Sequence, residues 1–95
     1  MYLKENCLDV WPPSVANCSE SILINTDQRR VRVEWPLPSF SDPHGESEVR
    51  MTSQNYGEPQ STFEWGTYTV QYAAAKTRNA LTNECVFTVS VLRKF

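Results

Sequence analysis

The sequence predicts an all-β domain, an antiparallel sandwich of two sheets with about seven strands. Apolar side chains recur with a period of two over most of the chain, which is the spacing of strands that are half buried in a sheet. Turn-forming residues separate these runs at fairly even intervals. With 95 residues, of which 40% are hydrophobic, the chain is long enough for one core and too short for two domains.

The first four expected strands are short and lie between turns rich in proline and aspartate. Residues 13–17 follow a Trp-Pro-Pro turn, and residues 21–25 carry isoleucines at alternate positions. In residues 30–36, two valines and a tryptophan alternate with arginine and glutamate. In residues 47–53, a valine and a methionine alternate with charged and polar side chains. Each pattern predicts one buried and one exposed face.

The last three expected strands include the two most regular ones. Residues 60–64 follow a Tyr-Gly-Glu-Pro turn, and residues 67–75 alternate apolar side chains with threonine and glutamine. Residues 83–92 place cysteine, phenylalanine and two valines on one phase. Residues 1–8 show no alternation, so we expect a tail or interdomain linker there and the folded domain at residues 9–95.

Charge and hydropathy exclude two classes of partner. Nine lysines and arginines stand against 11 aspartates and glutamates, so the formal charge of −2 gives no general attraction to nucleic acid or to an anionic membrane. No apolar run approaches the roughly 18 residues of a membrane span, so we expect no membrane insertion. The opening residues also lack the hydrophobic stretch of a secretory signal. If the cysteines form structural disulfides, the chain is an exported piece of a longer precursor.

The three cysteines allow several arrangements. Cys85 shares the inward phase of its strand, so its partner must approach from the opposite layer or from a sheet edge. Pairing with Cys18 would join the first and last strands, whereas Cys7 lies in the unpatterned tail and is a weaker partner for either. Three reduced cysteines in a cytosolic protein are the remaining arrangement. Because three is odd, Cys7 is either unpaired or part of an interdomain disulfide with a preceding module.

The chain offers little material for catalysis or metal binding. His44 lies in a Pro-His-Gly turn, and a pair of Cys7 and His44 has no third, orienting group. There is no glycine-rich phosphate loop and no C-x-x-C zinc spacing, so we expect no cofactor, no metal and no catalytic residue. Four acidic residues that are expected to be solvated in turns match no calcium loop: Asp9, Asp42, Glu46 and Glu48.

The aromatic residues divide into two groups. Those on inward strand phases are expected in the core: Trp35, Tyr68, Tyr72 and Phe87. Tyr68, at the head of a late strand, stands where a tyrosine corner is expected. Those in or beside loops are Trp11, Phe40, Tyr56 and Trp65. We predict protein contacts for Trp65, Tyr56 and Phe40, because exposed aromatics are enriched in binding hot spots; the alternative is that they close the ends of the sandwich.

Asn17-Cys18-Ser19 is a glycosylation sequon. Asn17 is therefore a possible glycosylation site, although a disulfide-bonded cysteine in the middle position would hinder modification.

Three motifs together resemble the HYR (hyalin repeat) domain over residues 12–91. They are V-x-W-x-x-P from Val33, F-x-x-G-x-x-x-V-x-Y from Phe63, and C-x-F-x-V-x-V from Cys85. Further matching positions, in chain order, are Pro12-Pro13, Cys18, Asp42, Gly45 and Asn79. Two departures are Ser19, where the family usually has proline, and Lys76-Thr77-Arg78-Asn79, where it has an aspartate followed by Gly-Asn.

The resemblance implies an immunoglobulin-like sandwich with a bridge between Cys18 and Cys85. It also implies a non-enzymatic, secreted module that mediates adhesion or spaces its neighbours in an extracellular mosaic protein. The expected partner is a receptor, matrix or adhesion protein, and neighbouring sushi modules would explain Cys7. Trp65 is the first contact candidate because the family more often has smaller residues there. The alternatives are a cytosolic immunoglobulin-like interaction domain with reduced cysteines and a small hydrolase that uses Cys7.

Overall fold

The computed structural model describes residues 11–45 and 48–94, and this part of the chain is all-β, as predicted. Each of the seven expected strands is present, with its bounds shifted by a few residues at most. One further strand, β5, was not expected. The strands are β2 (Ser14–Ala16), β3 (Ile22–Thr26), β4 (Arg30–Glu34), β5 (Ser39–Ser41), β6 (Val49–Gln54), β7 (Gln60–Glu64), β8 (Gly66–Lys76) and β9 (Thr82–Arg93). The expected boundary between residues 8 and 9 lies outside the described residues.

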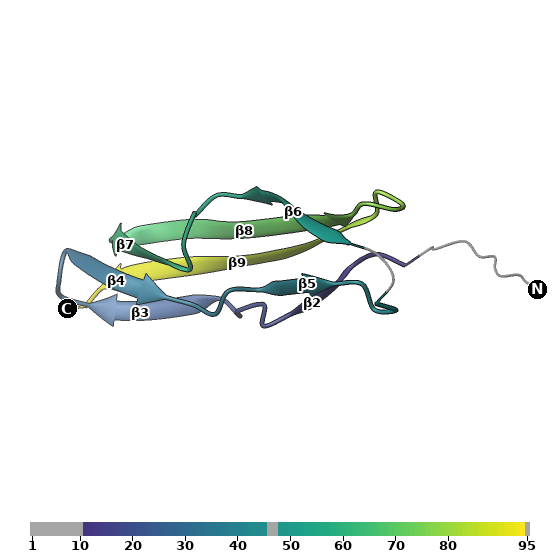
Figure 1. Cartoon of the computed structure of the whole chain (residues 1–95). Helices are drawn as coiled ribbons and strands as arrows, with labels where there is room; N and C mark the ends of the chain where they lie inside the picture. The colour runs from purple at the N-terminus through teal and green to yellow at the C-terminus, as the bar shows by residue number, and fades with distance from the viewer. Residues whose placement is uncertain (1–10, 46–47, 95) are drawn as a thin grey trace, which may run out of the picture.

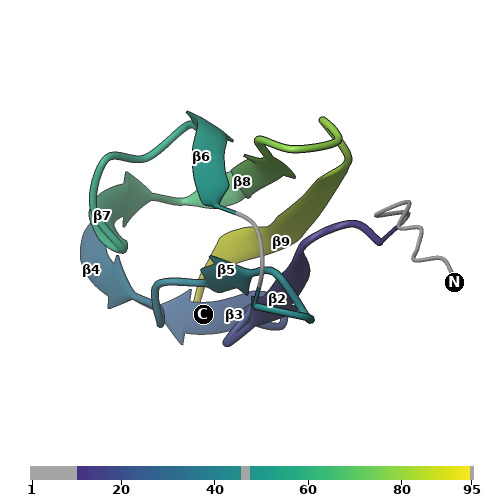
Figure 2. The same ribbon diagram turned by 45° about the vertical axis from the view of Figure 1, so that its right-hand side comes forward.

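The strands form one large and two small sheets that enclose a common core (Figures 1 and 2). The large sheet has the order β3-β9-β8-β6, and the small sheets pair β4 with β7 and β2 with β5. Four pairs are antiparallel, but β3 and β9 are parallel. The predicted antiparallel sandwich is present, and this one parallel pair departs from it. β3 and β9 run in the same direction, and a hairpin cannot join parallel strands.

The core forms where the inward phases of β8 and β9 meet those of β4 and β7. Trp35 lies at its centre, and its Nε1 donates a buried hydrogen bond of 2.8 Å to the hydroxyl of Tyr72. Its ring lies 5.9 Å from that of Phe87 and 6.2 Å from that of Phe63, centroid to centroid. The predicted inward positions of Trp35, Tyr72 and Phe87 are confirmed. The other buried apolar residues of this cluster are Val33, Val70, Cys85, Val89 and Val91.

A disulfide joins Cys18 to Cys85, the pairing that the resemblance implies, with a Cα–Cα distance of 5.5 Å. Cys85 is buried in β9, whereas Cys18 lies exposed between β2 and β3. The bridge thus fastens the N-terminal segment to the last strand shortly before β3 begins its parallel pairing with β9. Removing such a bridge from a small domain typically costs about 2 to 5 kcal/mol of stability.

A tyrosine corner forms where it was expected, at the start of β8. The Tyr68 hydroxyl donates a hydrogen bond of 3.0 Å to the carbonyl of Glu64. The ring passes over Gly66, where a Cβ atom would lie 3.3 Å from the Tyr68 hydroxyl oxygen. Gly66 has φ +149°, a conformation that residues with side chains rarely adopt. The corner therefore depends on glycine at this position.

A buried ion pair lies at the other end of β8. Lys76 Nζ donates to Asp42 Oδ1 and to the Trp11 carbonyl, each at 3.0 Å, and the two charged side chains are 0% and 2% exposed. The expectation that Asp42 is solvated in its turn was wrong, and β8 continues past the expected strand end at residue 75 to include Lys76. The inward phase of Tyr72 and Ala74 continues to Lys76, which is the last residue of β8.

The described chain enters and leaves the sandwich at opposite ends (Figure 1). Trp11 lies beside the end of β8 and the β8–β9 turn, where its carbonyl accepts hydrogen bonds from Lys76 and Asn79. Lys94, after β9, donates its backbone N–H to the carbonyl of Thr26 at the far end of β3. The fold therefore places Trp11 and Lys94 at opposite ends of the sandwich.

Candidate functional site

Trp65 lies between β7 and β8, near the point where β9 ends. It is half buried and packs against the core cluster, and its Nε1 donates a hydrogen bond of 3.3 Å to the Thr26 carbonyl. The guanidinium carbon of Arg93 lies 5.1 Å from the ring centroid, within range of a cation–π interaction. Trp65 therefore both closes this end of the sandwich and presents part of its ring to solvent.

Tyr56 and Phe40, the other two predicted contacts, are also half buried against the core. Tyr56 makes edge contacts with Trp35 and Phe63, each at a centroid distance of 5.7 Å. Phe40 lies in β5 opposite Val15 of β2. Among the described residues, no ring contact joins any two of the three predicted contact residues. They do not form one aromatic patch, and their role in binding stays a prediction.

The turn at residues 42–45 holds the residues considered for chemistry. His44 is exposed, its backbone N–H donates to Asp42 Oδ1 at 3.1 Å, and its ring lies 5.8 Å from that of Trp11. Residues 11–45 and 48–94 contain no group of three His, Cys, Asp or Glu side chains that could hold a metal ion. Cys7, Asp9 and Glu46 lie outside the described residues, as does any pairing of Cys7 with His44.

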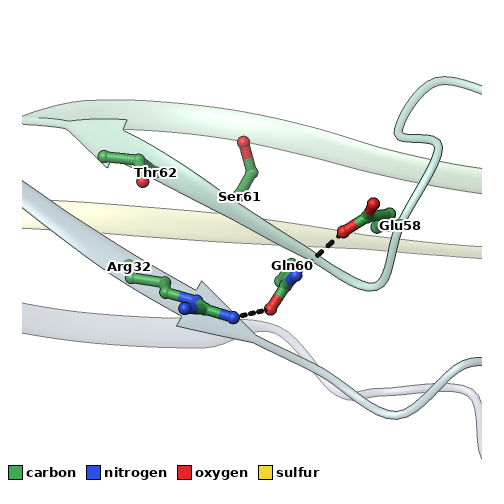
Figure 3. A pocket seen from close by; sticks show the side chains of 5 residues that line it. All are labelled: Arg32, Glu58, Gln60, Ser61 and Thr62. Carbon is green, nitrogen blue, oxygen red and sulfur yellow. Dashed lines mark hydrogen bonds between the residues drawn. The ribbon is translucent and has the colours of Figure 1, made fainter.

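A depression of about 320 Å³ is lined by residues of β4, of β7 and of the turn before β7 (Figure 3). Arg32 donates a hydrogen bond to Gln60 Oε1, and Gln60 Nε2 donates to Glu58 Oε1 at 2.8 Å. Ser61 and Thr62 complete its lining. Arg32, Gln60 and Glu58 pair with one another, and no base contacts the hydroxyls of Ser61 and Thr62, so the described lining offers no activated nucleophile. It is a polar surface suited to contact.

The outer faces of the two layers differ in charge. On the β4–β7 pair, Arg30 Nε lies 3.3 Å and Arg29 Nε 3.8 Å from carboxylate oxygens of Glu64. Arg32 Nε lies 3.4 Å from Glu34 Oε2. The neighbouring outer positions of β3, β8 and β9, by contrast, carry no charge over a continuous area: Leu23, Asn25, Thr67, Thr69, Gln71, Val86, Thr88, Ser90 and Leu92.

Sequence reasoning missed this uncharged face, although the signal was present. From Val86 onward, the outward phase of residues 83–92 contains valine, threonine, serine and leucine, where a solvated strand usually carries charge. The parallel pairing then adds the outward phase of β3 beside it. That neighbour could not be known before the fold, because residues 21–25 and 83–92 are far apart in the chain.

Asn17 occupies an exposed position directly after β2, with φ 61°, a left-handed conformation that asparagine tolerates better than most residues. Its side chain is accessible, but the next residue is the bridged Cys18. Glycosylation at Asn17 stays a prediction.

A small β-sandwich that carries a disulfide is typical of immunoglobulin-like extracellular modules. The family model of the HYR domain matches residues 8–91, and the chain therefore belongs to the HYR domain family, whose members are non-enzymatic modules of extracellular proteins. Comparison with curated proteins found no match, and neither did comparison with solved structures. The described residues include no helix capable of crossing a membrane.

Proposed function

We propose that this HYR domain is a non-enzymatic, secreted module that spaces its neighbours in a mosaic protein and contacts a protein partner. The observation that carries the proposal is the placement of Trp11 and Lys94 at opposite ends of the sandwich. Segments attached before and after the domain are thereby held apart by its full length. The partner would be a receptor, matrix or adhesion protein, with sushi domains as candidate neighbours.

The end at which the chain leaves is the best contact surface. Trp65 and Arg93 stack there, and tryptophan and arginine are the residue types most enriched in hot spots of protein interfaces. The hydrogen bond from Trp65 to Thr26 fixes the ring before any partner arrives, so little side-chain freedom would be lost on binding. A partner or the following module would cover the exposed part of the ring.

The experiment separates contact from stability. Trp65→Ala removes the proposed contact and part of the packing at this end, so we expect binding to cells or matrix to fall about tenfold and the melting temperature to drop moderately. Val15→Ala is the matched control, because Val15 is likewise half buried against the core but lies in β2. Surfaces coated with each variant are assayed for cell attachment, and unfolding is followed in parallel.

Two results would contradict the contact. Equal loss of attachment for Trp65→Ala and Val15→Ala would show that only stability matters, and Trp65 would then close the end of the sandwich without contacting a partner. Unchanged attachment with Trp65→Ala would move the contact to Phe40 or Tyr56. The spacing role is tested separately by small-angle scattering of two tandem copies, whose largest dimension should be about twice that of one copy. A folded-back arrangement would contradict it.

A further inference from the structure

Most strand edges in the described part of the chain are protected against pairing with another molecule. β6 carries Arg50 and a register shift between Met51 and Ser53, and β2 and β5 have three residues each. β4 alternates arginine and glutamate with valine, and β7 ends at Glu64. Charges, bulges and short length are the usual devices that keep edge strands from associating.

β3 has none of these protections. Its sequence, Ile22–Thr26, contains no charge, no proline and no bulge, and β9 is its one partner strand within the described residues. Figure 2 shows β3 at the lower border of the sandwich. A five-residue uncharged edge of this kind is a template for a further strand.

The main-chain groups at this edge are available. Thr26 accepts from Lys94 on the β9 side, and main-chain groups alternate in direction along a strand. The main-chain N–H and C=O groups of Ile22 and Ile24 therefore also point toward β9. Those of Leu23 and Asn25 point away from β9, toward the open edge of the sheet. No hydrogen bond to these outward groups exists among residues 11–45 and 48–94.

Exposed apolar side chains accompany the edge. Leu23 is 63% exposed, the highest value among the large apolar side chains of the described residues, and Leu92 is 43% exposed. Leu23 pairs with Ser90 and Leu92 with Asn25, so the two leucines are diagonal neighbours on the outer face. A strand added beside β3 would lie next to Leu23 and cover part of its side chain, whereas Leu92 lies one strand farther away.

We propose that β3 binds β3 of a second copy of this chain, antiparallel about a two-fold axis at Ile24. In this register Leu23 lies opposite Asn25 of the copy, so the outward main-chain groups of both molecules satisfy one another. Asp27 then faces Ser21 of the copy, and Glu20 faces Gln28, so no acidic residue opposes another. A two-fold axis places two copies of the same strip side by side, so charged residues near the axis would meet like charges. The strip at β3 carries no charge and therefore avoids this repulsion.

The pairing extends the order β6-β8-β9-β3 into a sheet of two molecules. It goes beyond the proposed function, because a chain that stays monomeric can still space modules and contact a partner through Trp65. An edge of five residues is small for an interface, so the dimer is weak and gains strength where many copies are held together on a surface.

The test measures self-association of the oxidised 95-residue chain by sedimentation equilibrium up to about 1 mM, a range suited to a small interface. Cys7→Ser is present in every sample, so that no disulfide joins two chains. Leu23→Lys should raise the dimer dissociation constant by about tenfold or more, because it places a charge on each side of the axis. Val86→Lys is the matched control, since Val86 is 51% exposed on the same face but lies in β9, between two partner strands.

Hydrogen exchange locates the interface independently. The amides of Leu23 and Asn25 should become protected as concentration rises, whereas those of Ile22 and Ile24 should be protected at every concentration. A monomer throughout the range would overturn the proposal. So would a dimer that Leu23→Lys leaves intact, or one that Val86→Lys weakens equally.

Discussion

At the scale of single residues, we expect a large loss of stability when one partner of the Lys76–Asp42 ion pair is removed. Two charges lie almost entirely out of water, and each has further hydrogen-bonding groups close by: the Trp11 carbonyl for Lys76 and the His44 amide for Asp42. Their attraction must offset the loss of hydration of both ions, so the pair adds little net stability. Removing one partner leaves a buried charge, which is much less favourable.

We therefore expect Lys76→Met to lower the free energy of unfolding by about 3 to 5 kcal/mol. The double variant Lys76→Met with Asp42→Asn should recover a large part of this loss, because it buries no charge. Denaturant unfolding of the two variants and the parent measures both values. If the double variant were less stable than Lys76→Met alone, the buried charge would not be the cause.

At the scale of residues, the sequence predicted which side chains are buried in the core better than it predicted which side chains contact each other. The inward positions of Trp35 and Phe87 follow from alternation within a single strand. The partner of Lys76 lies 34 residues away, in a turn that looked solvated, and no local pattern connects the two. Trp65, Tyr56 and Phe40 were recognised as loop aromatics, but the degree of their burial depends on how the sandwich ends close, which alternation does not report.

At the scale of elements, the length of a strand determined whether the sequence predicted it. β8 and β9 have 11 and 12 residues, so their period of two is unmistakable. β5 has three residues among serines and prolines, too few for a period to show. The parallel pairing of β3 with β9 could not be derived either, because pairing partners distant in sequence are set by tertiary packing rather than by a local pattern.

Gly66 at the β7–β8 junction provides a prediction at the element scale. Gly66→Ala forces a side chain into a backbone conformation with φ +149° and against the Tyr68 hydroxyl, so the tyrosine corner should loosen, with a loss of about 1 to 3 kcal/mol. Gly57→Ala is the control, because Gly57 has ordinary φ and no atom lies within 4 Å of the place that its Cβ would take. Thermal unfolding of both variants provides the comparison; equal melting temperatures would mean that the corner does not require glycine.

At the scale of the whole molecule, the disulfide links the first segment to the last strand. Replacing Cys18 and Cys85 together by alanine should lower the free energy of unfolding by about 2 to 5 kcal/mol, because the unfolded chain would regain the freedom of a long loop. Cys7→Ser should leave the melting temperature unchanged. Alkylation of the denatured parent should label one cysteine before reduction and three after it, as mass spectrometry would show.

Three labelled cysteines before reduction, in protein purified under oxidising conditions, would contradict the bridge and favour the cytosolic alternative. The hydrolase alternative depends on Cys7 alone, so a hydrolytic rate that Cys7→Ser leaves unchanged would eliminate it.

The placement of the disulfide also determines how the domain responds to mechanical tension. Because the chain enters and leaves at opposite ends, a pull on its neighbours would, without a bridge, draw β3 and β9 in opposite directions and load their hydrogen bonds in shear. The bridge from Cys18 to Cys85 provides a covalent path that bypasses residues 19–84, whereas the core residues of β9 that follow Cys85 remain on this path. Force passes along residues 11–18, through the two sulfur atoms and out along β9. While the bridge is oxidised, the segment between the two cysteines cannot be drawn out, so load applied at the two ends of the domain would pass through the domain without extending that segment.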